Sequence, residues 1–66
     1  MSNNHVERMK DEHKGLTAKI KALNAFIHGN EIFNTLDDLE QARMIKQAGF
    51  MEAYAETLAS RIWANQ

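Results

Sequence analysis

The sequence predicts an all-α protein in which two long antiparallel helices, joined by a short helical connector, form a compact homo-oligomer. Two stretches carry apolar residues at alternating steps of three and four, which is the heptad spacing of a helix that packs on a partner helix. The chain contains no proline and only three glycines, so little interrupts either helix. At 66 residues it forms a single domain, 1–66, at the small end of what folds alone.

The first helix is predicted over about residues 5–28. Asn4, followed three residues later by Glu7, resembles a capping box at its start. Gly29-Asn30 is expected to end it in the left-handed conformation. The expected packing positions are Val6, Met9, His13, Leu16, Ile20, Leu23 and Ile27.

The connector is predicted over about residues 29–35 and the second helix over about 36–64. Glu31-Ile32-Phe33 is a short apolar segment that we expect to close the end of the hairpin. Thr35 followed by Asp38 is a second capping signature, and acidic residues there suit the positive end of a helix dipole. The packing positions of this helix are Met44, Ala48, Met51, Ala55, Leu58 and Ile62.

The composition restricts how so small a chain becomes stable. There is no cysteine, which removes disulfides and thiolate metal sites. His5, His13 and His28 lack the three- or four-residue spacing that places two metal ligands on one helical face. We therefore expect no metal and no cofactor, and self-association becomes the expected source of stability.

The charge pattern argues against DNA and membranes as partners. The net charge is −1, which disfavours a DNA-coating role, and no apolar run is long enough to cross a membrane. The N-terminus lacks the plan of a signal peptide, so a soluble cytoplasmic protein is expected. Residues 1–28 carry five cations and three acids, whereas residues 35–66 carry three cations and five acids. This asymmetry indicates either charge complementarity between the two helices or a phosphate site on the first.

Polar and aromatic side chains flank both packing seams at heptad spacing. Such positions commonly carry charges that pair between helices. Cations, rings and amides on one flank also match the phosphates, base faces and base edges of a nucleotide held between subunits. The flank of the first helix comprises His5, Arg8, Glu12, Gly15, Lys19, Ala22 and Phe26, and that of the second Gln47, Tyr54 and Arg61.

No motif for catalysis is present, so we predict that the chain is not an enzyme. It has no nucleophile with a nearby base, no phosphate-binding glycine loop and no paired-carboxylate or metal signature. His13 occupies a packing position and is interpreted as a polar core residue. Trp63 is interpreted as a packing residue or an anchor between subunits.

The chain resembles the phage anti-CBASS protein 2 family from about His5 to Ile62. The resemblance begins with the run Arg8-Met9-x-x-Glu12-x-x-x-Leu16-x-x-Lys19-Ile20-x-x-Leu23-x-x-Phe26-Ile27. It continues with Phe33, Leu36, Met44, Gln47, Met51, Tyr54, Leu58, Arg61 and Ile62. Its most distinctive parts are the block from Leu16 to Ile27 and the flank of Gln47, Tyr54 and Arg61.

The resemblance implies a function. Members of that family are small helical phage proteins that assemble as compact homohexamers and bind cyclic oligonucleotides without degrading them. They act as sponges for the second messengers of bacterial CBASS immunity, in the cytoplasm of the infected host. Cyclic dinucleotides occupy pockets between neighbouring subunits, and some members hold cyclic trinucleotides at a separate symmetric site.

The same resemblance implies a set of binding residues. Lys19 is similar to the family lysine that contacts the dinucleotide phosphates. The family aromatic residue that stacks on the bases, often tyrosine, corresponds to His5, or to Asn4 if the register shifts by one. Histidine offers less stacking area than tyrosine, and asparagine offers none.

Three further cations complete the candidate set. Arg8 is similar to an arginine of the family pattern, although it can also pair with Glu12 four residues on. Lys21 and Arg61 are candidates for a trinucleotide site. The alternative function is a small coiled-coil module that binds a helix of another protein and no nucleotide.

Overall fold

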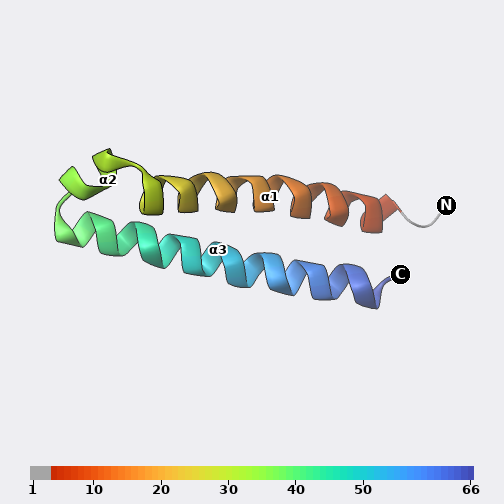
Figure 1. Ribbon diagram of the computed structural model, residues 1–66. Coiled ribbons are helices and arrows are strands. Elements are labelled where there is room, and N and C mark those ends of the chain that lie inside the picture. Colours follow the sequence, from red (N-terminus) through yellow and green to blue (C-terminus); the bar gives the residue numbers. More distant parts are fainter. Residues whose placement is uncertain (1–3) are drawn as a thin grey trace.

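The computed structural model describes residues 4–66 as a helical hairpin (Figure 1). Helix α1 spans Asn4–Gly29, the short α2 spans Glu31–Thr35, and α3 spans Asp38–Ala64. The two long helices run antiparallel, α2 closes one end, and both termini lie at the other. The hairpin measures 50 × 15 × 12 Å. The all-helical prediction is confirmed, since residues 4–66 include no strand.

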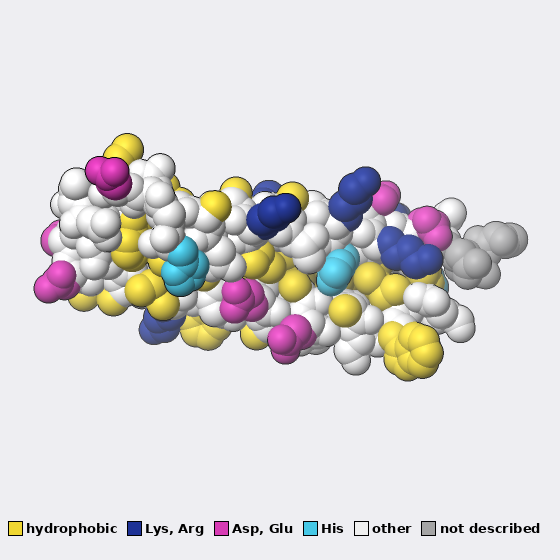
Figure 2. All heavy atoms as spheres, viewed as in Figure 1, with side chains coloured by type: hydrophobic (Ala, Val, Ile, Leu, Met, Phe, Trp, Pro, Cys, Tyr) yellow, Lys and Arg dark blue, Asp and Glu magenta, His cyan; other side chains and the backbone are white. Residues whose placement is uncertain are grey.

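The core is the seam between α1 and α3, and it follows the two predicted series of apolar residues. Every predicted packing position is buried or half-buried, including the half-buried His13. Val6, Met9 and Leu58 form a cluster near the termini, on which Ile62 packs. Leu58 is the most enclosed, with 1% of its surface exposed. Figure 2 shows hydrophobic side chains along the junction of the two helices. The heptad spacing therefore identified the contact surface of each long helix.

The closed end of the hairpin is held by an aromatic pair and a glutamine. Phe33 of α2 is buried and meets Phe26 of α1 edge to face, with the ring centroids 6.2 Å apart. The side-chain amide of Gln41 donates to the carbonyl oxygens of Phe33 at 2.9 Å and Leu36 at 3.1 Å. The connector is thus the helical turn that the sequence predicted, tied to both long helices.

The predicted left-handed end of the first helix is wrong. No residue of 4–66 has a positive φ, and Asn30 is extended, with φ −107° and ψ 126°. Its side-chain oxygen accepts a hydrogen bond from the backbone N–H of Ile32 at 2.8 Å. Asn30 therefore serves as the N-cap of α2, a role that requires extended backbone. Asn4 is also not a cap preceding the helix, because it already lies within α1.

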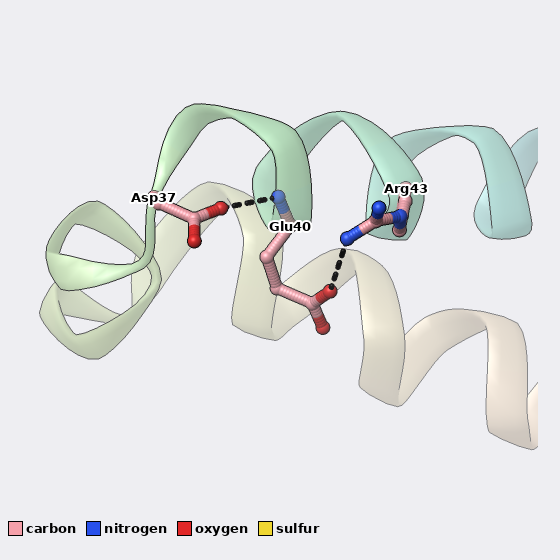
Figure 3. A network of polar contacts seen from close by, with 3 residues as sticks. All are labelled: Asp37, Glu40 and Arg43. Atoms are coloured by element: carbon pink, nitrogen blue, oxygen red, sulfur yellow. Dashed lines mark hydrogen bonds and ion pairs between the residues drawn. The ribbon is translucent and has the colours of Figure 1, made fainter.

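The cap of the second long helix is Asp37 rather than the predicted Thr35. Asp37 is extended, and its carboxylate accepts from the backbone N–H of Glu40 at 2.7 Å (Figure 3). The Glu40 carboxylate lies 3.9 Å from the guanidinium of Arg43, one turn further on. The Thr35 hydroxyl instead donates to the carbonyl of Ile32 at 2.7 Å, within α2. The second long helix therefore begins at Asp38, two residues later than predicted.

Replacing Leu58 by alanine is expected to lower the free energy of unfolding by about 2–5 kcal/mol, because it removes the most enclosed side chain of the seam. Leu39→Ala is the matched control, since Leu39 is 61% exposed and its loss should change stability by about 0.5 kcal/mol or less. Urea unfolding at one fixed protein concentration measures both variants. Equal losses would contradict the position of the core.

Replacing Asp37 by alanine is expected to cost about 1 kcal/mol, because the backbone N–H of Glu40 loses its cap. Thr35→Ala should cost less, since it removes only an exposed hydrogen bond within α2. Thermal unfolding followed by circular dichroism compares the two. A greater loss in Thr35→Ala would restore Thr35 as the cap.

Candidate functional site

Most of the candidate residues gather at the open end of the hairpin. The His5 ring Nε2 lies 3.5 Å from the side-chain oxygen of Asn65, and the Asn65 amide donates to the Arg61 carbonyl at 2.7 Å. These contacts join the start of α1 to the end of α3. Asn4 precedes His5, and Arg8 follows it by about one helical turn. The structure thus brings four of the six candidates to one end of the molecule.

Lys19 lies on the same flank of α1 as Arg8, but further along. Eleven residues separate them, which is about 16 Å at 1.5 Å per residue. His5 and Lys19 are separated by about 21 Å on the same estimate. One chain therefore does not bring the candidate phosphate-binding lysine to the candidate stacking residue.

Lys21 lies on the opposite flank of α1. Residues advance by about 100° around a helix, so two positions separate Lys21 from Lys19 by about 200°. Asn24, three residues after Lys21, lies on this same flank. Its side-chain amide donates to the Glu52 carboxylate of α3 at 3.0 Å. The two lysines consequently face different sides of the hairpin, and in one chain they cannot line one pocket.

All six candidates are exposed, and their cations are unpaired among residues 4–66. The ion pairs in this part of the chain are Lys10 with Glu7 at 3.7 Å and Arg43 with Glu40 at 3.9 Å. Arg8 does not pair with Glu12, which was the structural alternative for this arginine. The exposed ammonium and guanidinium groups are therefore available to an anionic ligand.

A hollow on α3 includes residues that sequence reasoning missed. It measures about 430 Å³, and its wall is almost entirely apolar. The Lys46 ammonium lies 5.9 Å from the centroid of the Phe50 ring, and Phe50 is 66% exposed. The hollow is lined by Arg43, Lys46, Gln47, Phe50, Met51 and Tyr54.

The signal for this hollow was the spacing of its residues. Lys46, Phe50 and Tyr54 recur at steps of four, so they form a stripe along the exposed side of α3. The heptad spacing predicted Gln47 and Tyr54 as flanking residues but not Phe50. A second hollow of about 300 Å³ lies between α1 and α3, beside Asn24 and Glu52.

Within residues 4–66, no three His, Asp or Glu side chains are close enough together to hold a metal ion. The histidines are separated along the hairpin, with His5 and His28 exposed and His13 half-buried in the seam. No described helix has the length and apolar character needed to cross a membrane. What the site offers is therefore a set of exposed cations, rings and amides suited to binding.

The chain matches the model of one known protein family. The family model described as Sequestin matches residues 3–64, which include both long helices and the connector. The chain belongs to the Sequestin family. No match was found among curated proteins or among solved structures.

The family name suggests a sequestering protein, which is a binding role rather than an enzymatic one. It agrees with the resemblance to the anti-CBASS family on which the sequence analysis relied. This Sequestin chain carries its candidate ligand-binding groups on the exposed flanks of its two long helices.

Proposed function

We propose that this Sequestin chain is a phage-encoded sponge for cyclic oligonucleotides. It binds the second messengers of bacterial CBASS immunity in the cytoplasm of the infected host and does not cleave them. The observation that carries the proposal is the family match over residues 3–64, together with the exposed Lys19 within the block that resembles the anti-CBASS family. Sequestration requires tight binding and slow release, and no catalytic group.

The ligand chemistry fits the exposed groups. Each phosphate of a cyclic dinucleotide carries a negative charge that an ammonium binds through charge-assisted hydrogen bonds. Lys19 supplies that ammonium, and Arg8 lies on the same flank with its guanidinium unpaired. The bases stack on a flat ring, for which His5 is the candidate and Asn4 the alternative after a shift of one residue. No single chain encloses these groups around one ligand, because His5 and Lys19 are about 21 Å apart.

Assembly therefore belongs to the proposal. Within residues 4–66, six large hydrophobic side chains are 46–79% exposed, whereas the main core cluster holds three buried residues. A 66-residue chain with so small a core gains stability when copies cover each other's apolar surface. We propose a homo-oligomer, a hexamer on the strength of the resemblance, with dinucleotide pockets between neighbouring copies. A two-fold interface suits a two-fold cyclic ligand, since each copy contacts one half.

Lys21 and Arg61 are assigned to a second ligand, a cyclic trinucleotide. Lys21 faces away from Lys19, so it does not belong to the dinucleotide pocket on the same chain. Arg61 lies near the open end, where the side-chain amide of Asn65 donates to its backbone carbonyl. The Arg61 guanidinium forms no ion pair among the described residues. Lys21 is therefore separate from Lys19, whereas Arg61 lies at the same end of the chain as His5. A trinucleotide site that uses both Lys21 and Arg61 must combine them from different copies.

Thermal unfolding in the presence of 3′,3′-linked cyclic GMP–AMP tests the proposal against the alternative of a coiled-coil adaptor. The exposed Phe50 and Trp63 are the observation that favours an adaptor. A sponge gains stability by mass action, equivalent to about 2.7 kcal/mol when free ligand is a hundred times its Kd. An adaptor shows no shift with this ligand. Absence of any shift with cyclic dinucleotides and cyclic trinucleotides alike would leave the adaptor.

Lys19→Ala is expected to weaken binding of the same dinucleotide about ten- to a hundredfold, because one charge-assisted phosphate contact is lost. Lys14→Ala is the matched control: Lys14 is also an exposed lysine of α1, and the proposal gives it no ligand contact. Isothermal titration measures both the affinity and the number of ligands per chain. Unchanged affinity in Lys19→Ala would remove Lys19 from the pocket, and less than one ligand per chain supports a shared pocket.

A further inference from the structure

Helix α3 presents two exposed stripes of opposite charge. The basic stripe borders the larger hollow and consists of Arg43, Lys46, Phe50 and Tyr54. The acidic stripe consists of Ile45, Glu52, Glu56 and Trp63, which recur at steps of seven, four and seven. Each stripe therefore combines exposed apolar side chains with charges of one sign.

The two stripes face different directions. Phe50 and Trp63 are 13 residues apart, which separates them by about 140° around α3. Both lie outside the seam, since Phe50 is 66% exposed and Trp63 is 79% exposed. One copy can consequently present the basic stripe to one neighbour and the acidic stripe to another.

Most charges of the two stripes have no close partner of opposite charge among the described residues of the same chain. Lys46 has no acidic partner among the described residues and lies over the Phe50 ring at 5.9 Å. Arg43 is only loosely paired, 3.9 Å from Glu40, with both side chains at least 49% exposed. On the acidic stripe, Glu52 accepts a hydrogen bond from the uncharged Asn24, which holds its carboxylate in place without neutralising it.

We propose that the basic stripe of one copy docks on the acidic stripe of the next, so that α3 helices form a head-to-tail contact between copies. The occupant is a second copy because one chain carries both complementary surfaces, each with a large exposed aromatic ring. Pairing the basic stripe with itself would instead bring the Lys46 and Arg43 cations of two copies together. A contact between two different surfaces repeats from copy to copy, and it gives a closed ring where the rotation between successive copies closes.

The contact covers the apolar surface that the hairpin leaves open. Phe50 and Trp63 are aromatic residues of the kind that dominate interface energetics when they are buried. The almost entirely apolar wall of the larger hollow suits such a ring better than it suits a polar ligand. This inference rests on the assembly part of the proposed function and is independent of the ligand.

Charge reversal tests the contact. Lys46→Glu and Glu56→Lys each place like charges across it, and each is expected to raise the dissociation constant of the assembly at least about tenfold. The double variant Lys46→Glu/Glu56→Lys restores opposite charges and should recover the wild-type mass. Light scattering coupled to size exclusion measures the mass against the 7.6 kDa chain. Circular dichroism confirms that each variant remains helical.

Matched controls separate this contact from a general effect of charge. Lys14→Glu and Asp11→Lys make the same two charge changes at exposed positions of α1, outside both stripes, and should leave the mass unchanged. Three results would overturn the inference. The wild type could be monomeric, both charge reversals could leave the mass of the assembly unchanged, or the double variant could fail to recover the wild-type mass. If the assembly survives both reversals and still binds cyclic dinucleotide, the proposed function stands and only this contact is wrong.

Discussion

The seam between α1 and α3 is the constraint on which the rest of this molecule depends. Its main cluster of buried residues consists of Val6, Met9 and Leu58. Two helices that meet along one stripe leave most of their circumference in solvent. A chain of 66 residues has no third layer to cover that surface, so the fold itself favours contacts between copies.

The same seam decides where ligand-binding groups can be. A residue beside the seam lies on one of two flanks, and its position in the heptad determines which flank. Lys19 and Lys21 differ by two positions and therefore lie on opposite flanks, whereas His5 and Asn65 meet across the open end, 60 residues apart in sequence. Ligand groups on a straight hairpin are thus dispersed along its length. In the proposed function, a pocket that holds both His5 and Lys19 combines residues from different copies, so ligand binding and assembly depend on each other.

Periodicity predicted the two long helices, and each packing position that it predicted is buried or half-buried, because residues that pack along one seam recur at the heptad spacing. The same spacing places Phe26 on the flank, but it is half-buried against Phe33. The helix ends were harder, since several residues near a turn are chemically able to cap. Asn30 and Asp37 took that role because they precede α2 and α3 in extended conformation, and Thr35 was already within α2. The stripe through Phe50 was not predicted, because an apolar residue on an exposed face cannot be distinguished from a core residue by its type alone. Which binding groups share a pocket was not predictable from one chain, since in the proposed function the pocket lies between two copies.

A hairpin of this kind suits sequestration for a physical reason. A sponge needs many binding sites per unit of protein and a slow release, and it needs no moving part. Short chains that share pockets give many sites per unit of protein. Release is slow because a ligand held between two copies must lose its contacts to both chains before it dissociates. The exposed cations of α1 contribute little to the stability of the folded chain while no anion is present. In the proposed function, these cations contribute when a phosphate binds in a site from which neighbouring copies have displaced water, where charge-assisted hydrogen bonds are strongest.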